Sequence, residues 1–248
     1  MERLREVPKV KIEKNAPGNT IELDFGRLVN NVWGAPPEEV LTTSIFQNEN
    51  GNVGWSWDRP NPQLKPGQTL AQPVYPCVRI GGNPWEKSKS PLFPFQWGEV
   101  QSLKLEISYD YTRLPTGACD LAYDIFFIDS QQPGPNVQRK AEVMVWLNGT
   151  QKQPPSSYQG DYSDDINSYS LYSRVLSDGR LYAAFIQKGT PQYPAHHVVD
   201  AAKLMGYLKL DSRWYVPGIE LGNEVWKGAG EILISQISVN LNGKAIGL

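Results

Sequence analysis

The stretch Val100-Gln101-Ser102-Leu103-Lys104-Leu105-Glu106-Ile107-Ser108-Tyr109 decides the fold class, because apolar and polar side chains alternate along it. A β-strand that packs one face on a core and shows the other to water has this period of two. Denser apolar runs predict strands that are buried more deeply, at residues 119–128 and 141–147. Further runs predict four more strands, at residues 169–174, 181–187, 214–221 and 232–241. The chain is therefore predicted to be all-β.

Turn signals separate these runs and refine the prediction. Asn50-Gly51, Pro66-Gly67, Asn148-Gly149 and Asp178-Gly179 are pairs that favour tight turns. Many short strands with such spacing predict a β-sandwich of two antiparallel sheets, or jelly roll. We expect one domain over residues 1–248, since all-β sandwiches reach this size as single units. Residues 196–210 break the pattern with helical spacing and predict one helix on the outer face of a sheet.

The composition excludes several classes of function. A net charge of −2 and a pI near 5.8 argue against a nucleic-acid-binding protein, which would carry a basic stripe. No apolar run is long enough to span a membrane. The charged opening, residues 1–6, has no apolar segment of the kind found in signal peptides. The 8 tryptophans and 12 tyrosines could fill a core or line a groove that binds sugars.

The cysteines and histidines give no sign of a metal site. Two buried free thiols at Cys77 and Cys119 are favoured over a single cross-strand disulfide, because free cysteine behaves as a small apolar side chain. His196 and His197 precede Asp200, but adjacent residues do not share a helix face. No further cysteine or histidine is placed to complete a cluster, so we expect neither a metal nor a cofactor.

Two segments place carboxylates where they could do chemistry. In residues 141–147, alternation puts Glu142, Met144 and Trp146 on one face and three aliphatic side chains on the other. In residues 218–228, Glu220 and Glu224 share a strand face. An acid held in mid-strand among apolar side chains is unfavourable unless it is paired or functional. The alternative is an ordinary salt bridge or a solvated carboxylate at a strand end.

A pair of carboxylates on strands with aromatic neighbours suits glycoside hydrolysis. A retaining enzyme needs one ionised carboxylate to attack the anomeric carbon and one protonated carboxylic acid to protonate the leaving oxygen. In retaining enzymes the two groups lie roughly 5–5.5 Å apart, against about 6.5–9.5 Å in inverting enzymes.

The chain resembles glycoside hydrolase family 12 over residues 30–241. Five motifs carry the resemblance in the family's order: Asn30-Asn31-Val32-Trp33-Gly34, Tyr75-Pro76, Ala122-Tyr123-Asp124-Ile125-Phe126, Glu142-Val143-Met144-Val145-Trp146-Leu147 and Gly222-Asn223-Glu224-Val225-Trp226. The resemblance implies a two-sheet jelly roll with a long cleft on its concave face. It also implies hydrolysis of β-1,4-glucans with retention of configuration.

The resemblance also implies roles for individual residues. Glu142 matches the nucleophile, Glu224 the acid/base, and Asp124 an aspartate that hydrogen-bonds near the nucleophile. Glu220 is expected to line the cleft as a hydrogen-bonding partner. Four aromatic or sulfur-containing side chains and one amide are expected to contact sugars: Asn31 and Trp33 on the non-reducing side, Trp85 at a distal sugar, and Met144 and Trp146 on the cleft floor.

The sequence departs from the family beside the acid/base. Asn223 and Val225 replace residues that are common there, and both could alter the sites for leaving-group sugars. Residues 148–160 correspond to a loop that arches over the cleft. Trp55 and Trp57 could extend the sugar platform or pack within the sandwich, and both alternatives are open.

These observations predict a monomeric endo-β-1,4-glucanase, a cellulase that acts on a polysaccharide outside the cell. A xylanase or a mixed-linkage glucanase of the same clan is the alternative enzyme. A carbohydrate-binding jelly roll without turnover is the alternative from another class, although such a module does not need two opposed carboxylates.

Overall fold

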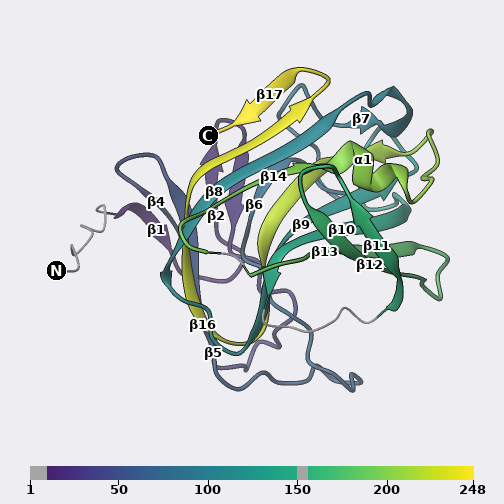
Figure 1. The fold of residues 1–248 in the computed structure, drawn as a ribbon. Coiled ribbons are helices and arrows are strands. Elements are labelled where there is room, and N and C mark those ends of the chain that lie inside the picture. The colour runs from purple at the N-terminus through teal and green to yellow at the C-terminus, as the bar shows by residue number, and fades with distance from the viewer. Residues whose placement is uncertain (1–9, 150–155, 191) are drawn as a thin grey trace.

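The structure is a computed structural model that describes residues 10–149, 156–190 and 192–248. Its strands form two sheets that lie face to face, joined by one long strand (Figure 1). The first sheet follows the order β1 (Val10–Lys14), β4 (Thr42–Asn48), β5 (Val53–Arg59), β16 (Gly218–Leu241), β8 (Leu103–Arg113), β14 (Ala195–Asp200), with β17 (Lys244–Gly247) on the end of β16.

The second sheet carries the site. Its order is β2 (Thr20–Leu23), β3 (Gly26–Val29), β6 (Cys77–Gly81), β16, β9 (Ala118–Ile128), β10 (Arg139–Gly149), β13 (Leu181–Gln187), β12 (Ser168–Val175), β11 (Ser157–Ser163). The pairs are antiparallel except β10 with β13. A short pair, β7 (Phe95–Gln96) and β15 (Tyr215–Val216), and the 3-10 helix η1 (Trp97–Glu99) complete one end. The predicted jelly-roll sandwich is confirmed.

The core lies between the two sheets. β8 is alternately buried and exposed along its length, as the pattern at residues 100–109 predicts. Trp55 and Trp57 are completely buried in this core, so they pack within the sandwich and do not extend a sugar platform. Cys77 and Cys119 are buried and are not joined by a disulfide, as expected.

β16 corrects the prediction of two separate strands at residues 214–221 and 232–241. It is continuous over Gly218–Leu241, and its first part pairs with β9 while its second part pairs with β5 and β8. The change of sheet occurs at Gly228, whose φ is +106°. A Cβ there would lie 1.8 Å from the carbonyl oxygen of Thr116, so only glycine allows this close crossing.

The predicted helix at residues 196–210 is wrong in its first half. Residues 195–200 form the edge strand β14, paired with β8, and the helix α1 spans only Ala201–Gly206. Two adjacent valines favour the strand, and Asp200 starts the helix by accepting a hydrogen bond from the Lys203 backbone N–H at 3.0 Å. The buried side chains of α1 join the main core beside β8.

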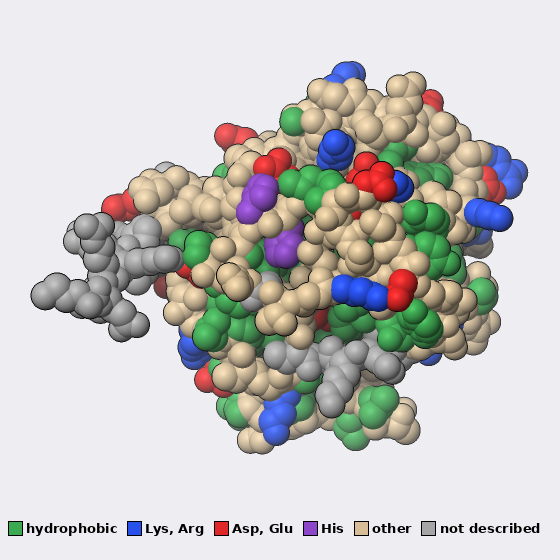
Figure 2. Space-filling view, viewed as in Figure 1, with side chains coloured by type: hydrophobic (Ala, Val, Ile, Leu, Met, Phe, Trp, Pro, Cys, Tyr) green, Lys and Arg blue, Asp and Glu red, His purple; other side chains and the backbone are tan. Residues whose placement is uncertain are grey.

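Two expectations concern residues that the structure does not describe. The opening residues 1–6, for which no signal peptide was predicted, lie outside the described part of the chain. So do residues 150–155 of the segment 148–160 that was expected to arch over the cleft, while residues 148–149 end β10 and residues 157–160 begin β11. Within the described residues, no helix is long and apolar enough to cross a bilayer. Acidic and basic side chains are interspersed over the face shown in Figure 2.

Candidate active site

The candidate site lies on the face of the second sheet that points away from the first sheet. We call this the cleft face and define it by Glu142, Met144 and Trp146 of β10. Strand pairing aligns its residues in rows that run across the strands: Asp124 of β9 lies opposite Met144 on one side and Glu220 on the other. Glu142 lies opposite Phe126, and Glu224 lies opposite Asp120. The two catalytic candidates therefore stand on the two strands that flank β9.

A cleft of about 670 Å³ opens on this face. Seven residues predicted to contact substrate or carry out catalysis line it: Asn31, Trp33, Trp85, Asp124, Glu142, Glu220 and Glu224. Val29, Tyr75, Arg79, Asn83, Phe126, Arg139 and Arg180 complete its lining. None of these last seven residues was predicted from the sequence to be a site residue, and three of them are arginines.

Met144 and Trp146 do not line this cleft, although they share its face. Each is almost fully buried, in a small cluster with Ala122 and Ala184 that Tyr182, Ile186 and Trp226 partly cover. The Tyr182 hydroxyl donates to the Met144 sulfur at 3.3 Å. The cluster fills the sheet surface beside the carboxylates, so these two side chains support the site without forming its open floor.

The two exposed tryptophans of the cleft are held by the same local device. The backbone N–H of Trp33 donates to the Asn31 side chain at 3.2 Å, and that of Trp85 donates to the Asn83 side chain at 3.0 Å. Each Asn-X-Trp turn presents an indole that is about half exposed, 52% for Trp33 and 50% for Trp85. The repeated Asn-X-Trp pattern is visible in the sequence, and it marks Asn83 as the counterpart of Asn31.

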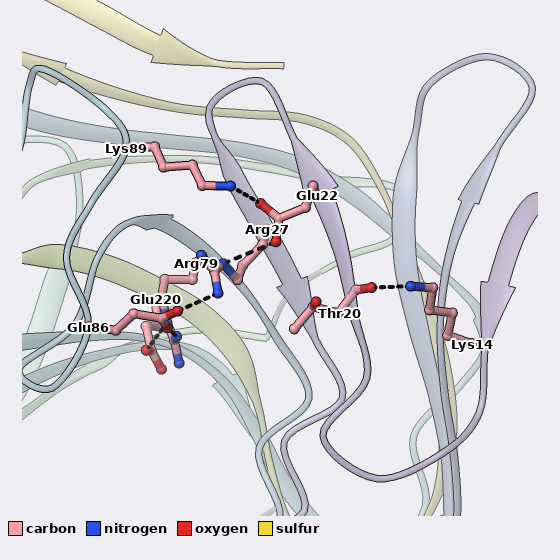
Figure 3. A network of polar contacts seen from close by, with 8 residues as sticks. All are labelled: Lys14, Thr20, Glu22, Arg27, Arg79, Glu86, Lys89 and Glu220. Atoms are coloured by element: carbon pink, nitrogen blue, oxygen red, sulfur yellow. Dashed lines mark hydrogen bonds and ion pairs between the residues drawn. The ribbon is translucent and has the colours of Figure 1, made fainter.

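A chain of alternating charges connects the cleft to the surface (Figure 3). The Arg79 guanidinium donates to Glu220 at 2.6 Å and to Glu86 at 2.9 Å, and Glu86 also accepts from Arg27 at 2.6 Å. Arg27 and Lys89 both reach Glu22 at the outer end. Burial opposes the charge on Arg79, but Glu220 raises its pKa overall. Glu220 is thereby a paired carboxylate, and Glu86 fixes the loop that carries Trp85.

Glu142 has cations beside it. Burial raises the pKa of Glu142, while Arg139 and Arg180 act to lower it. The two arginines also repel one another, and burial with this repulsion lowers the pKa of Arg139. Arg139 reaches the cleft because the register of β10 shifts between Arg139 and Ala141, a bulge that turns its side chain. Its guanidinium lies over the Trp85 ring, 5.1 Å from the centroid.

Glu224 has another carboxylate beside it. Its backbone N–H donates to Asp120 at 3.4 Å, and Asp120 is completely buried. Burial, the charges of Asp120 and Glu142, and a hydrogen bond with the Asp120 carboxyl raise the pKa of Glu224 well above its usual range. The second oxygen of Asp120 has no hydrogen-bond donor among the described residues. One proton shared by the carboxyl groups of Glu224 and Asp120 supplies the missing donor and avoids two negative charges side by side.

Asp124 lies between the two candidates. Burial and the charges of Glu142, Glu220 and Glu224 raise its pKa well above the usual range. Its Oδ1 is buried without a hydrogen-bond partner in the described part of the chain. Both observations favour the neutral acid, which carries its own donor.

Asn223 and Val225 do not face the leaving-group side, contrary to the expectation for them. Both are fully buried on the core side of β16, the opposite side from Glu224. The Asn223 side chain accepts from the Trp55 indole at 2.8 Å and donates to the Tyr111 hydroxyl and to the Asp120 backbone oxygen. Its role is to hold the strand that carries Glu224 against the core and against β9.

The histidines belong to the first sheet and have structural contacts. His196 is 2.9 Å from the Ser108 hydroxyl, and His197 stacks on Tyr109. Among the described residues, no three side chains of the types that bind metals are grouped to hold an ion.

Comparison with known proteins agrees with this arrangement. The family model for glycosyl hydrolase family 12 matches residues 27–242. Endoglucanase S of Pectobacterium parmentieri is 25% identical over 236 residues, which cover 86% of this chain and 81% of that protein.

Solved structures show the same fold. A family 12 xyloglucanase from Bacillus licheniformis, in complex with ligand, superimposes with a TM-score of 0.81 at 23% identity, over 93% of this chain and 100% of that chain. An endoglucanase from Rhodothermus marinus gives a TM-score of 0.75 at 20% identity, over 96% and 100%. The match of the family model to most of the sequence, together with a cleft lined by paired carboxylates on a jelly-roll sheet, shows that the chain belongs to glycosyl hydrolase family 12 and is a glycoside hydrolase.

Proposed function

We propose that this hydrolase is an endo-β-1,4-glucanase that retains the anomeric configuration, with Glu142 as nucleophile and Glu224 as acid/base. The observation that carries the assignment is the distribution of charge in the cleft. Arg139 and Arg180 oppose the rise in the pKa of Glu142 that burial and Glu220 cause, whereas the charges of Asp120 and Glu142 add to the rise that burial causes at Glu224. The charged group is the one that can attack, and the protonated group is the one that can donate.

The reaction then proceeds in two displacements. The Glu142 carboxylate forms a bond to the anomeric carbon as the bond to the leaving oxygen breaks, and Glu224 gives its proton to that oxygen. Water next attacks the glycosyl–enzyme ester, its proton passes to Glu224, and Glu142 leaves as a carboxylate. Both carboxyl groups return to their starting state, as double displacement requires.

A neutral Asp124 has a defined part in this scheme. It lies one row away from Glu142 on the neighbouring strand and can donate a hydrogen bond to a carboxylate there. Donation favours the ionised nucleophile and fixes its orientation. Asp124 is therefore a positioning residue for Glu142.

The open form of the cleft supports endo-cleavage of a polymer. Exposed indoles at Trp33 and Trp85 offer flat apolar surfaces to the C–H faces of glucosyl rings. A polymeric β-glucan is the substrate class that such a groove suits, and a substrate of that size implies that the enzyme acts outside the cell.

The first test is the release of reducing ends from soluble carboxymethylcellulose and from mixed-linkage β-glucan, with Glu142→Gln as the control. We expect cleavage by the wild type and a loss of at least ~10³-fold in the variant, since the amide cannot attack. NMR of the first products should show the β-anomer. Release of the α-anomer first, or full activity in the variant, would reject the assignment.

A further inference from the structure

The cleft face continues beyond the catalytic strands onto β12 and β11. In the row that contains Asp124 and Met144, the register passes to Ala184 of β13, then to Tyr172 of β12 and finally to Tyr158 of β11. Figure 1 shows β10, β13, β12 and β11 adjacent on one side of the molecule. Because Tyr172 and Tyr158 follow the same row across the sheet, their side chains lie on the face that carries the carboxylates.

The two tyrosines form an aromatic pair on this face, with Tyr158 exposed and Tyr172 half-buried. Their ring centroids are 5.6 Å apart with the planes inclined at 58°, and 55% of the Tyr158 surface is open to solvent. On the opposite face of this sheet, Leu171 of β12 and Phe185 of the neighbouring β13 are buried in the main core. Nothing in the packing of the sandwich therefore requires aromatic side chains at the positions of the two tyrosines.

Polar contacts hold the pair in place. The Asp161 carboxylate accepts hydrogen bonds from the Tyr158 hydroxyl and, at 3.0 Å, from the Ser170 hydroxyl. Lys188 forms an ion pair with the same carboxylate at 2.6 Å. A fixed aromatic surface edged with hydrogen-bond donors and acceptors suits a sugar ring, which has an apolar face and a polar rim.

We infer that Tyr158 and Tyr172 form a distal subsite of the cleft that binds the β-glucan chain on the far side of the cleaved bond from Trp33. The inference rests on the proposed function. β12 and β11 are two and three strands away from β10, which is roughly 10–15 Å at the usual strand spacing. The catalytic strands separate this platform from the indoles of Trp33 and Trp85, so the platform serves the reducing, leaving-group side of a long substrate.

The test compares a long and a short substrate in the same variants. Tyr158→Ala/Tyr172→Ala should reduce kcat/KM on a long soluble β-glucan relative to kcat/KM on an aryl cellobioside, whose leaving group cannot reach the platform. We expect this ratio to fall roughly tenfold, equivalent to about 1.4 kcal/mol. Tyr158→Phe keeps the ring and should preserve most of the ratio.

Tyr207→Ala is the matched control. Tyr207 is also exposed, at 42%, and also pairs with an aromatic ring, that of Tyr162 at 4.6 Å, but Tyr162 packs toward the main core. This control should leave the ratio unchanged. An unchanged ratio in the double variant, with an unchanged melting temperature, would overturn the inference.

Binding without turnover separates this inference from the proposed function. In gels that contain mixed-linkage β-glucan, Glu142→Gln should be retarded more strongly than Glu142→Gln with both tyrosine substitutions. Equal retardation would reject the platform even if the enzyme cleaves glucan. Weaker retardation of the triple variant would support the platform even if no polymer were hydrolysed, an outcome that would reject only the proposed function.

Discussion

The protonation state of Asp124 is the most informative question at the scale of single residues. Its buried oxygen without a donor and its raised pKa both indicate a neutral acid that donates to its neighbours. Asparagine also carries a donor and no charge, so Asp124→Asn should keep kcat within about tenfold of the wild type. Asp124→Ala removes the donor and should lower kcat by ~10²-fold.

The pair of variants distinguishes two roles for Asp124. If the residue acted as a carboxylate, for instance as a base, asparagine would be as damaging as alanine. Equal losses in Asp124→Asn and Asp124→Ala, measured as kcat on an aryl cellobioside at constant pH, would therefore contradict a neutral donor.

At the scale of the element, the bulge at the start of β10 has a functional consequence. It turns Arg139 into the cleft, where its charge favours ionisation of Glu142. Arg139→Gln should raise the pKa of Glu142, so the acidic limb of kcat/KM should move to higher pH by roughly half a pH unit or more. A pH–rate profile on an aryl cellobioside measures this shift.

Lys140→Gln is the control for that charge, because Lys140 is the next residue and is paired with Asp129 at 3.3 Å. The acidic limb should stay in place in this variant. A shift of the same size in both variants would mean that the overall positive charge, and not the position of Arg139, sets the limb.

The crossing of β16 between sheets gives a second prediction at this scale. Gly228→Ala should cost about 1–2 kcal/mol for the positive φ and a further ~1–3 kcal/mol for the clash with Thr116. Gly179 has a φ of +83° and open space around its missing Cβ, so Gly179→Ala isolates the first cost. Urea denaturation of both variants measures the difference, and equal stabilities would show that the crossing tolerates a side chain.

Part of the fold and of the candidate site could be predicted from the sequence. Alternation located β8, denser apolar runs located β9 and β10, further apolar runs located β12 and β13, and the family motifs identified the carboxylates. The position of Arg139 was not predicted, because the regular alternation of residues 141–147 contains no sign of the bulge that turns this side chain into the cleft. The sequence pattern divided β16 because Lys227, Gly228 and Gly230 resemble a loop until their partners on β9 and β5 are known.

At the scale of the whole molecule, the site depends on the order of strands more than on the strands themselves. β10 and β16 are far apart in the sequence, and only their common neighbour β9 brings Glu142 and Glu224 to one cleft. The same order extends the cleft face to Tyr158, which no local pattern connects to catalysis. Long-range pairing of this kind is specified by the complete fold, so the sequence indicated which residues matter but not all of their neighbours.

The grouping of buried acids also affects the stability of the whole molecule. Asp120, Asp124, Glu142 and Glu224 have pKa values that burial and mutual repulsion raise in the folded chain. Such groups bind protons more tightly when folded, so their contribution to stability is complete below the usual values of 3.8 and 4.5. It is lost as the pH rises through the folded values. The cluster should therefore make the protein less stable toward neutral pH.

Asp120→Asn removes one of these acids and tests the prediction through the slope of the melting temperature between pH 4 and pH 7. The wild type should lose more Tm over this interval than the variant does. Glu39 works in the opposite direction, because its hydrogen bonds from Arg59 and Gln63 overcome the effect of burial and lower its pKa. It is present in both proteins, so the difference in slope comes from Asp120 and from its effect on Glu224. The control is Glu38→Gln, at an exposed position, which should reproduce the wild-type slope. If the slope of Asp120→Asn were as steep as that of the wild type, Asp120 would be ionised in the folded enzyme.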